Sequence, residues 1–75
     1  MVTLTVQNGE ISTTFRGNSK QIHGEIGNGI AVLMTEYINQ CRKHKDPEDK
    51  INLSFQEMID KINVYVDEAT GISFL

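Results

Sequence analysis

Three glycines lie close together in the segment His23–Ala31, which reads HGEIGNGIA. Gly24 and Gly29 have the glycine spacing of a P-loop, but that motif continues with a lysine and a hydroxyl residue, and here isoleucine and alanine follow. Gly24 and Gly27 have the GxxG spacing with which KH domains clamp a nucleic-acid backbone. The central Glu25 would repel phosphate. The segment is therefore predicted to form the first turns of a helix rather than a phosphate-binding loop.

The single cysteine and two histidines are the other residues that could do chemistry. His44 lies three positions after Cys41, which is half of a zinc-binding pattern, and no further cysteine exists to complete it. His23 lies about 27 Å from Cys41 along a helix at ~1.5 Å per residue, too far to act as its base. Acidic residues cluster only in segments expected to be solvated. We predict a protein that is not an enzyme and binds no metal or cofactor.

Residues 2–16 alternate between apolar and polar side chains on both sides of Asn8-Gly9. Asn-Gly is the strongest short signal for a two-residue β-hairpin turn, because both central residues need positive φ. This turn fixes the register and gathers the apolar residues on one face. The predicted pairs are Val6 with Ile11, Leu4 with Thr13, and Val2 with Phe15.

Apolar residues then recur every three or four positions, which predicts a helix from about Ser19 to Lys43 capped by Asn18 or Ser19. A second helix follows. The capping box that begins at Ser54 places its start there, whereas Asp46 as N-cap and Pro47 as first helical residue would place it earlier.

Residues 62–75 allow two interpretations. The three-and-four spacing through Ile62 favours a helix that Gly71 terminates, followed by an apolar tail, and the alternation near Val64 would instead suit a second hairpin. The preferred fold is α+β, with an N-terminal two-stranded hairpin packed on two helices in the order β-β-α-α. The chain of 75 residues is predicted to be a single domain, 1–75.

Composition limits the kinds of partner and compartment. The formal net charge is −3, which argues against nucleic acid as the main partner. The chain has no apolar run long enough to cross a membrane and no secretion signal at its beginning. One cysteine suits a reducing compartment, so a cytoplasmic location is expected.

The opening MVTLTVQNGEIS, followed by a long helix, resembles short uncharacterised bacterial proteins of prophages and other mobile elements. The resemblance covers residues 1 to about 45 and rests on pattern, so it transfers no active residue. It implies a small accessory or counter-defence protein that acts by binding a host or phage protein.

A small domain with broad apolar faces usually has an interface, and the edges of a two-stranded sheet can add strands across a two-fold axis. We therefore predict a protein–protein interaction module acting as a homodimer. The alternatives are a compact monomer and a nucleic-acid-associated regulator. The predicted interface residues are Gly24, Gly27, Ala31, Met34, Ile72 and Phe74. The regulator would use Arg16, Lys20, Arg42, Lys43 and Lys45.

Overall fold

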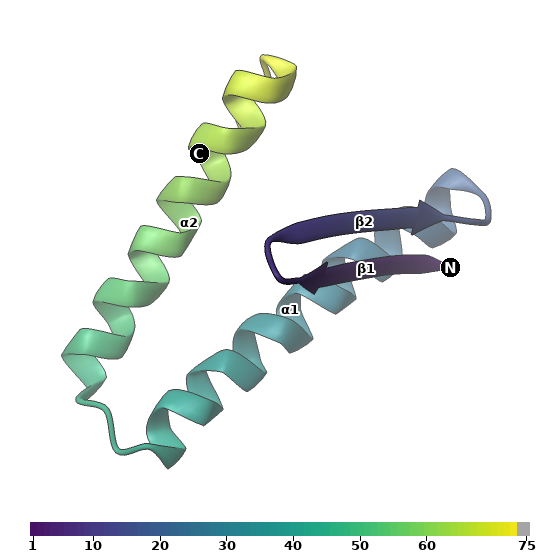
Figure 1. The fold of residues 1–75 in the computed structure, drawn as a ribbon. Helices are drawn as coiled ribbons and strands as arrows, with labels where there is room; N and C mark the ends of the chain where they lie inside the picture. The colour runs from purple at the N-terminus through teal and green to yellow at the C-terminus, as the bar shows by residue number, and fades with distance from the viewer. Residues whose placement is uncertain (74–75) are drawn as a thin grey trace. The chain divides into compact units, whose positions relative to one another are not determined.

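The computed structural model describes residues 1–73 and shows a two-stranded hairpin followed by two helices (Figure 1). The fold class is therefore α+β, as predicted. The residues divide into two compact units, Met1–Tyr37 and Ile38–Leu75, which are described one at a time. The elements are β1 (Val2–Gln7), β2 (Glu10–Phe15), α1 (Ser19–Lys43) and α2 (Glu48–Thr70).

The hairpin of the first unit has the predicted register. β1 pairs antiparallel with β2, with Val2 opposite Phe15 and Leu4 opposite Thr13. Asn8 and Gly9 have φ of 52° and 79°, the positive values that a type I′ turn requires. The turn chemistry and the period-two alternation agree, so the sequence alone specifies this register.

A capping box holds the start of α1. The Asn18 Oδ1 accepts a hydrogen bond from the Gln21 N–H at 2.9 Å, and the Asn18 N–H donates to Gln21 Oε1 at 3.1 Å. Two backbone donors that would lack helical partners are thereby satisfied. The N-cap is Asn18, one of the two residues predicted. α1 then runs without interruption through the three glycines to Lys43.

Glycine at position 29 weakens α1 without serving any contact within the described chain. A Cβ at this position would meet no heavy atom within 4 Å, and its φ is not positive. Gly29→Ala is therefore expected to raise the free energy of unfolding by about 0.5–1 kcal/mol, measured by urea denaturation. The measurement is made at protein concentrations low enough for the chain to be monomeric, and a loss of stability there would contradict the open surroundings of Gly29.

In the second unit, α1 ends in a Schellman motif. The Lys45 N–H donates to the Arg42 carbonyl at 2.9 Å and the Asp46 N–H donates to the Cys41 carbonyl at 3.0 Å. Lys45 has a φ of 61°, so a lysine occupies the left-handed position that glycine prefers. An Arg42–Glu48 ion pair of 2.8 Å spans the connection to α2, but both side chains are more than half exposed, so it adds little stability.

The predicted start of α2 at the Ser54 capping box is wrong. The helix begins at Glu48, and the extended Pro47 is its N-cap rather than its first residue, so the alternative start from Asp46 and Pro47 was nearer but one residue early. The physical reason is Ile51, which lies one turn before Phe55 on the same face and is 4% exposed. Burying an isoleucine stabilises by about 1.5–3 kcal/mol, more than a cap contributes.

The second-hairpin interpretation of residues 62–75 is excluded as far as residue 73, because α2 continues to Thr70. Gly71 ends the helix in a left-handed conformation with φ of 76°, and its N–H donates to the Asp67 carbonyl at 2.7 Å. The predicted stop at Gly71 is confirmed.

Candidate functional site

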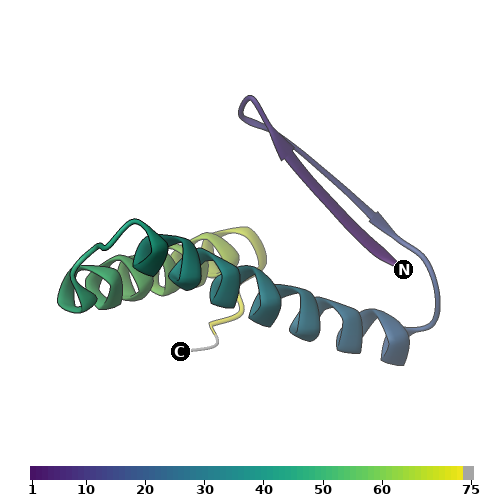
Figure 2. The same ribbon diagram turned by 90° about the horizontal axis from the view of Figure 1, so that it is seen from below.

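An apolar groove between the hairpin and α1 is the main surface feature of the first unit. Its volume is 320 Å³ and its walls are almost wholly apolar. Figure 2 shows the hairpin joined to α1 at one end, with the turn of the hairpin standing away from the helix. The groove is lined by Val2, Leu4, Thr13 and Phe15 of the hairpin, and by Glu25, Ile26, Gly29, Ile30 and Leu33 of α1.

Exposure along the hairpin follows this geometry. Val2, at the joined end, is half-buried, whereas Val6 and Ile11, next to the turn, are 63% and 69% exposed. These side chains lie on the same face as the residues that line the groove, because the pleat alternates side chains between faces. α1 therefore covers only part of the apolar face of the hairpin.

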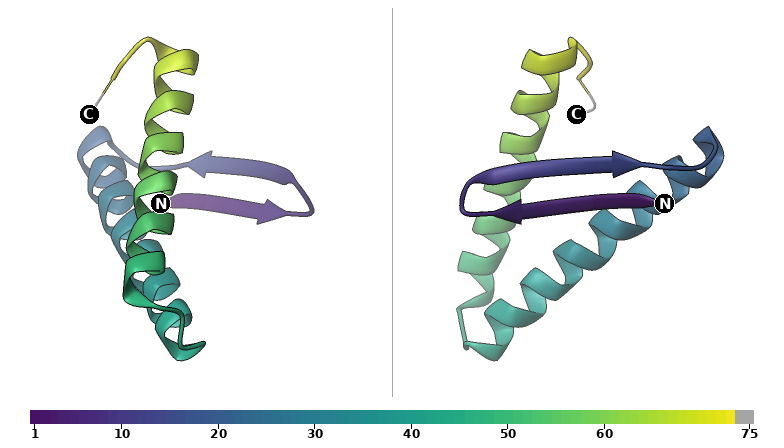
Figure 3. Two further views of the ribbon diagram at one scale, coloured as in Figure 1. Left: turned by 90° about the vertical axis from the view of Figure 1, so that its left-hand side faces the viewer. Right: turned by 45° about the vertical axis from the view of Figure 1, so that its right-hand side comes forward.

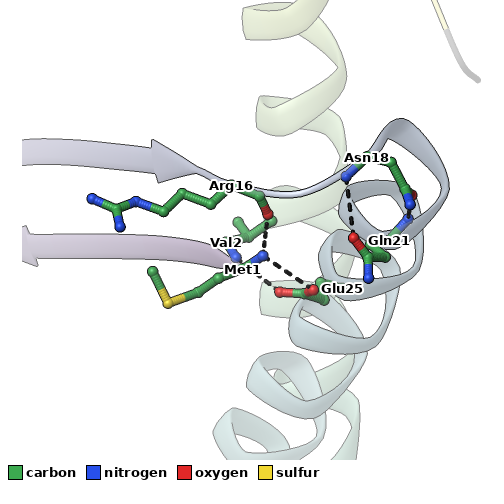
Figure 4. Close-up of polar contacts among 6 residues, drawn as sticks. All are labelled: Met1, Val2, Arg16, Asn18, Gln21 and Glu25. Carbon is green, nitrogen blue, oxygen red and sulfur yellow. Dashed lines mark hydrogen bonds and ion pairs between the residues drawn. The ribbon is translucent and has the colours of Figure 1, made fainter.

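Polar contacts hold the closed end of the groove (Figure 4). The Val2 N–H donates to Glu25 Oε1 at 2.8 Å, and the Met1 amino group lies 3.3 Å from Glu25 Oε2. Met1 and Arg16 exchange two backbone hydrogen bonds, one of them from Arg16 N–H to the Met1 carbonyl at 2.7 Å. Sequence reasoning did not identify Glu25 in this role, because the contact joins residues 23 positions apart.

Gly17 forms the bend between these contacts and α1. Its φ is 113°, and a Cβ there would lie 2.7 Å from Gln21 Oε1, the oxygen that accepts from Asn18. Glycine is needed for the backbone conformation, and a Cβ would also displace the flexible end of the Gln21 side chain.

The predicted interface residues on α1 do not line the groove. At ~100° per residue, the edge formed by Gly24, Gly27 and Ala31 lies roughly 160° around the helix from the groove residues of α1. No described atom lies within 4 Å of a Cβ built at Gly24 or Gly27. The close approach predicted at these glycines is thus absent within residues 1–73 of one chain. Any such contact would have to come from a second molecule.

The remaining interface residues have separate surroundings. Met34 is half-buried, and Ile72 is exposed just after the end of α2. Phe74 lies outside the described residues. Three groove residues of α1, namely Ile26, Ile30 and Leu33, belong to its apolar stripe, so periodicity was the available signal for them.

The basic residues proposed for nucleic acid fall in both units. Arg16 and Lys20 lie in the first, and Arg42, Lys43 and Lys45 in the second. Glu48 already neutralises Arg42 through their ion pair. The described contacts therefore give the nucleic-acid alternative no support beyond the sequence.

The groups considered for chemistry are not brought together. Cys41 is a free, half-buried thiol, and His23 is exposed on α1. Among residues 1–73, no three histidine, cysteine, aspartate or glutamate side chains are grouped so that they could hold a metal ion. Neither helix of this part of the chain is long and apolar enough to span a bilayer.

Comparison with known protein families, with curated proteins and with solved structures finds no match to this chain.

Proposed function

We propose that the chain is a small, non-enzymatic protein–protein interaction module of the cytoplasm that acts as a homodimer. The observation that carries this proposal is the open apolar groove of the first unit, with the exposed apolar residues beside it. The dimer would present its remaining surface to a host or phage protein, in line with the resemblance of the N-terminal half to mobile-element proteins.

The size of the chain supports self-association. Domains of fewer than about 80 residues rarely bury enough apolar surface to be stable alone, so disulfides, metals or oligomerisation usually reinforce them. The chain has 75 residues, and its one cysteine cannot form a disulfide within it. Only Ile51 is a buried apolar residue among those described, and it lies in the second unit. A second copy would supply the apolar contacts that the first unit lacks.

The test compares two neighbouring residues of α1. Leu33 lines the groove, and Val32 does not, although the two are 58% and 56% exposed. Wild-type protein is expected to sediment as a dimer at micromolar concentration. Leu33→Lys should raise the dimer Kd about tenfold or more, because the interface loses about 1.4 kcal/mol, whereas Val32→Lys should change it less than about twofold.

Circular dichroism of both variants controls for loss of helix. A wild-type chain that stays monomeric would contradict the proposal. Equal effects of Leu33→Lys and Val32→Lys on the dimer Kd would contradict it as well. Tight binding to nucleic acid, with a steep loss of affinity as salt rises, would favour the regulator instead.

A further inference from the structure

The alternation of hydrogen-bonded and non-hydrogen-bonded residue pairs along the hairpin determines which backbone N–H and C=O groups face outward. Met1 and Arg16 exchange hydrogen bonds in both directions, so they form a hydrogen-bonded pair. Such pairs alternate with non-hydrogen-bonded pairs along an antiparallel ladder. Val2–Phe15, Leu4–Thr13 and Val6–Ile11 are therefore the non-hydrogen-bonded pairs. Their N–H and C=O groups point away from the partner strand, toward the two outer edges.

The two outer edges differ. On the β1 edge, the Val2 N–H already donates to Glu25 Oε1. On the β2 edge, Ile11, Thr13 and Phe15 make no hydrogen bond with any described residue outside the hairpin. Both edges can be followed in Figure 3. Of the two, β2 is the edge left open along its whole length for another strand.

We propose that a second copy of this chain adds its β2 antiparallel to β2, with Thr13 on the two-fold axis. This inference rests on the proposed homodimer and adds the β2 edge to the interface beside the groove, because Thr13 and Phe15 belong both to this edge and to the lining of the groove. Thr13 would exchange hydrogen bonds with Thr13 of the second copy, and Ile11 with Phe15 of the second copy. The two hairpins would form one four-stranded antiparallel sheet.

Charge selects this register. With Thr13 on the axis, Glu10 of each copy lies opposite Arg16 of the other. Both side chains are exposed and neither has an ion-pair partner among the described residues. Figure 4 shows the Arg16 side chain extending away from Glu25. A shift of the axis to Ser12 places Glu10 opposite Thr14, and a shift to Thr14 places Arg16 opposite Ser12. Only the Thr13 register therefore matches the charges at both ends.

The same register continues the apolar face. Residues opposite each other in a sheet share a face, so Ile11 would lie beside Phe15 of the second copy. These side chains are 69% and 54% exposed in the single chain. A β-branched residue opposite an aromatic one is a favourable cross-strand pair, and Ser12 opposite Thr14 on the other face is another. The pairing thus buries apolar surface that α1 leaves uncovered.

The two-fold axis also limits the assembly. Pairing uses the β2 edge of both copies and leaves the β1 edges outside, where Glu25 occupies the N–H of Val2. An isologous contact of this kind closes at two copies, whereas a β1-to-β2 contact would continue into a filament.

Charge reversal tests the register on the full chain. Glu10→Arg places two arginines opposite each other at both ends of the strand pair, and Arg16→Glu places two glutamates there. Each variant alone should raise the dimer Kd about tenfold. An equimolar mixture of the two should recover wild-type affinity as a heterodimer, and the double variant Glu10→Arg/Arg16→Glu should recover it as a homodimer. Unchanged Kd in the single variants, or no recovery in the mixture, would overturn the register.

Amide hydrogen exchange followed by NMR tests the edge with a control inside the same chain. The N–H groups of Ile11, Thr13 and Phe15 should become protected as protein concentration rises through the Kd. Those of Leu4 and Val6, which face the β1 edge, should keep exchanging fast. A dimer that leaves the β2 amides unprotected would overturn the edge pairing while the proposed homodimer stands. A chain that remains monomeric would overturn the proposed homodimer itself.

Discussion

Gly17→Ala is expected to lower the free energy of unfolding by about 1.5–3 kcal/mol. A residue with a Cβ is strained by about 1–2 kcal/mol in a left-handed conformation, and φ is 113° here. The added Cβ would lie 2.7 Å from Gln21 Oε1, so Gln21 must move and its hydrogen bond from Asn18 is lost. The loss of this one hydrogen bond adds about 0.5–1 kcal/mol, since Asn18 Oδ1 keeps its N-cap bond from the Gln21 N–H. Urea denaturation at fixed protein concentration measures the sum.

A double-mutant cycle separates the strain of Gly17→Ala from its clash. In the background Gln21→Ala, the oxygen that the Cβ would meet is gone, so the cost of Gly17→Ala should fall to the strain of about 1–2 kcal/mol. Gly9→Ala is a second control, because its φ is 79° and its Cβ would meet nothing within 4 Å. If Gly17→Ala lowers the free energy of unfolding equally in both backgrounds, the added Cβ does not disturb the capping box.

Ile51→Ala is expected to cost about 2–4 kcal/mol, which is a large fraction of the stability of a small domain. Ile51 is 4% exposed and is the one buried apolar side chain among the described residues. Leu53→Ala, on the same helix but 60% exposed, should change stability by less than about 0.5 kcal/mol. Thermal unfolding at matched protein concentration compares the two variants.

The Ile51→Ala variant should also move the start of α2. Burial of Ile51 explains why the helix begins at Glu48 rather than at the capping box of Ser54. Without that side chain, the capping box should take over, and the amides of Ile51, Asn52 and Leu53, the first that donate within the helix, should lose protection from hydrogen exchange. Full protection there, combined with normal stability, would contradict the role given to Ile51.

Local sequence patterns predicted secondary structure correctly where the pattern involves residues a few positions apart. The Asn8-Gly9 turn and the alternation on both sides of it predicted the full register of the hairpin. The period of the apolar residues predicted α1, and Gly71 predicted the end of α2. These features depend on dihedral preferences and on side-chain periods within a few positions, which the sequence contains directly.

The candidate site was less accessible to sequence reasoning. The glycine edge at Gly24 and Gly27 was predicted from spacing, but spacing does not say whether any atom approaches it. The groove depends on how far the hairpin stands from α1, and Glu25 on a contact across 23 positions. Local backbone preferences set neither the spacing of the hairpin from α1 nor the contact of Glu25 with Val2.

By itself, the sequence determined the hairpin with its register and the first helix, and it favoured a second helix that Gly71 ends, because each rests on local backbone preferences. Only the tertiary structure decided that α2 begins at Glu48, that the apolar face of the hairpin stays partly uncovered, and that Glu25 occupies the edge of β1. These outcomes depend on which side chains meet across long stretches of chain. Burial and hydrogen bonding between distant residues settle them, and no short pattern of residues encodes those contacts.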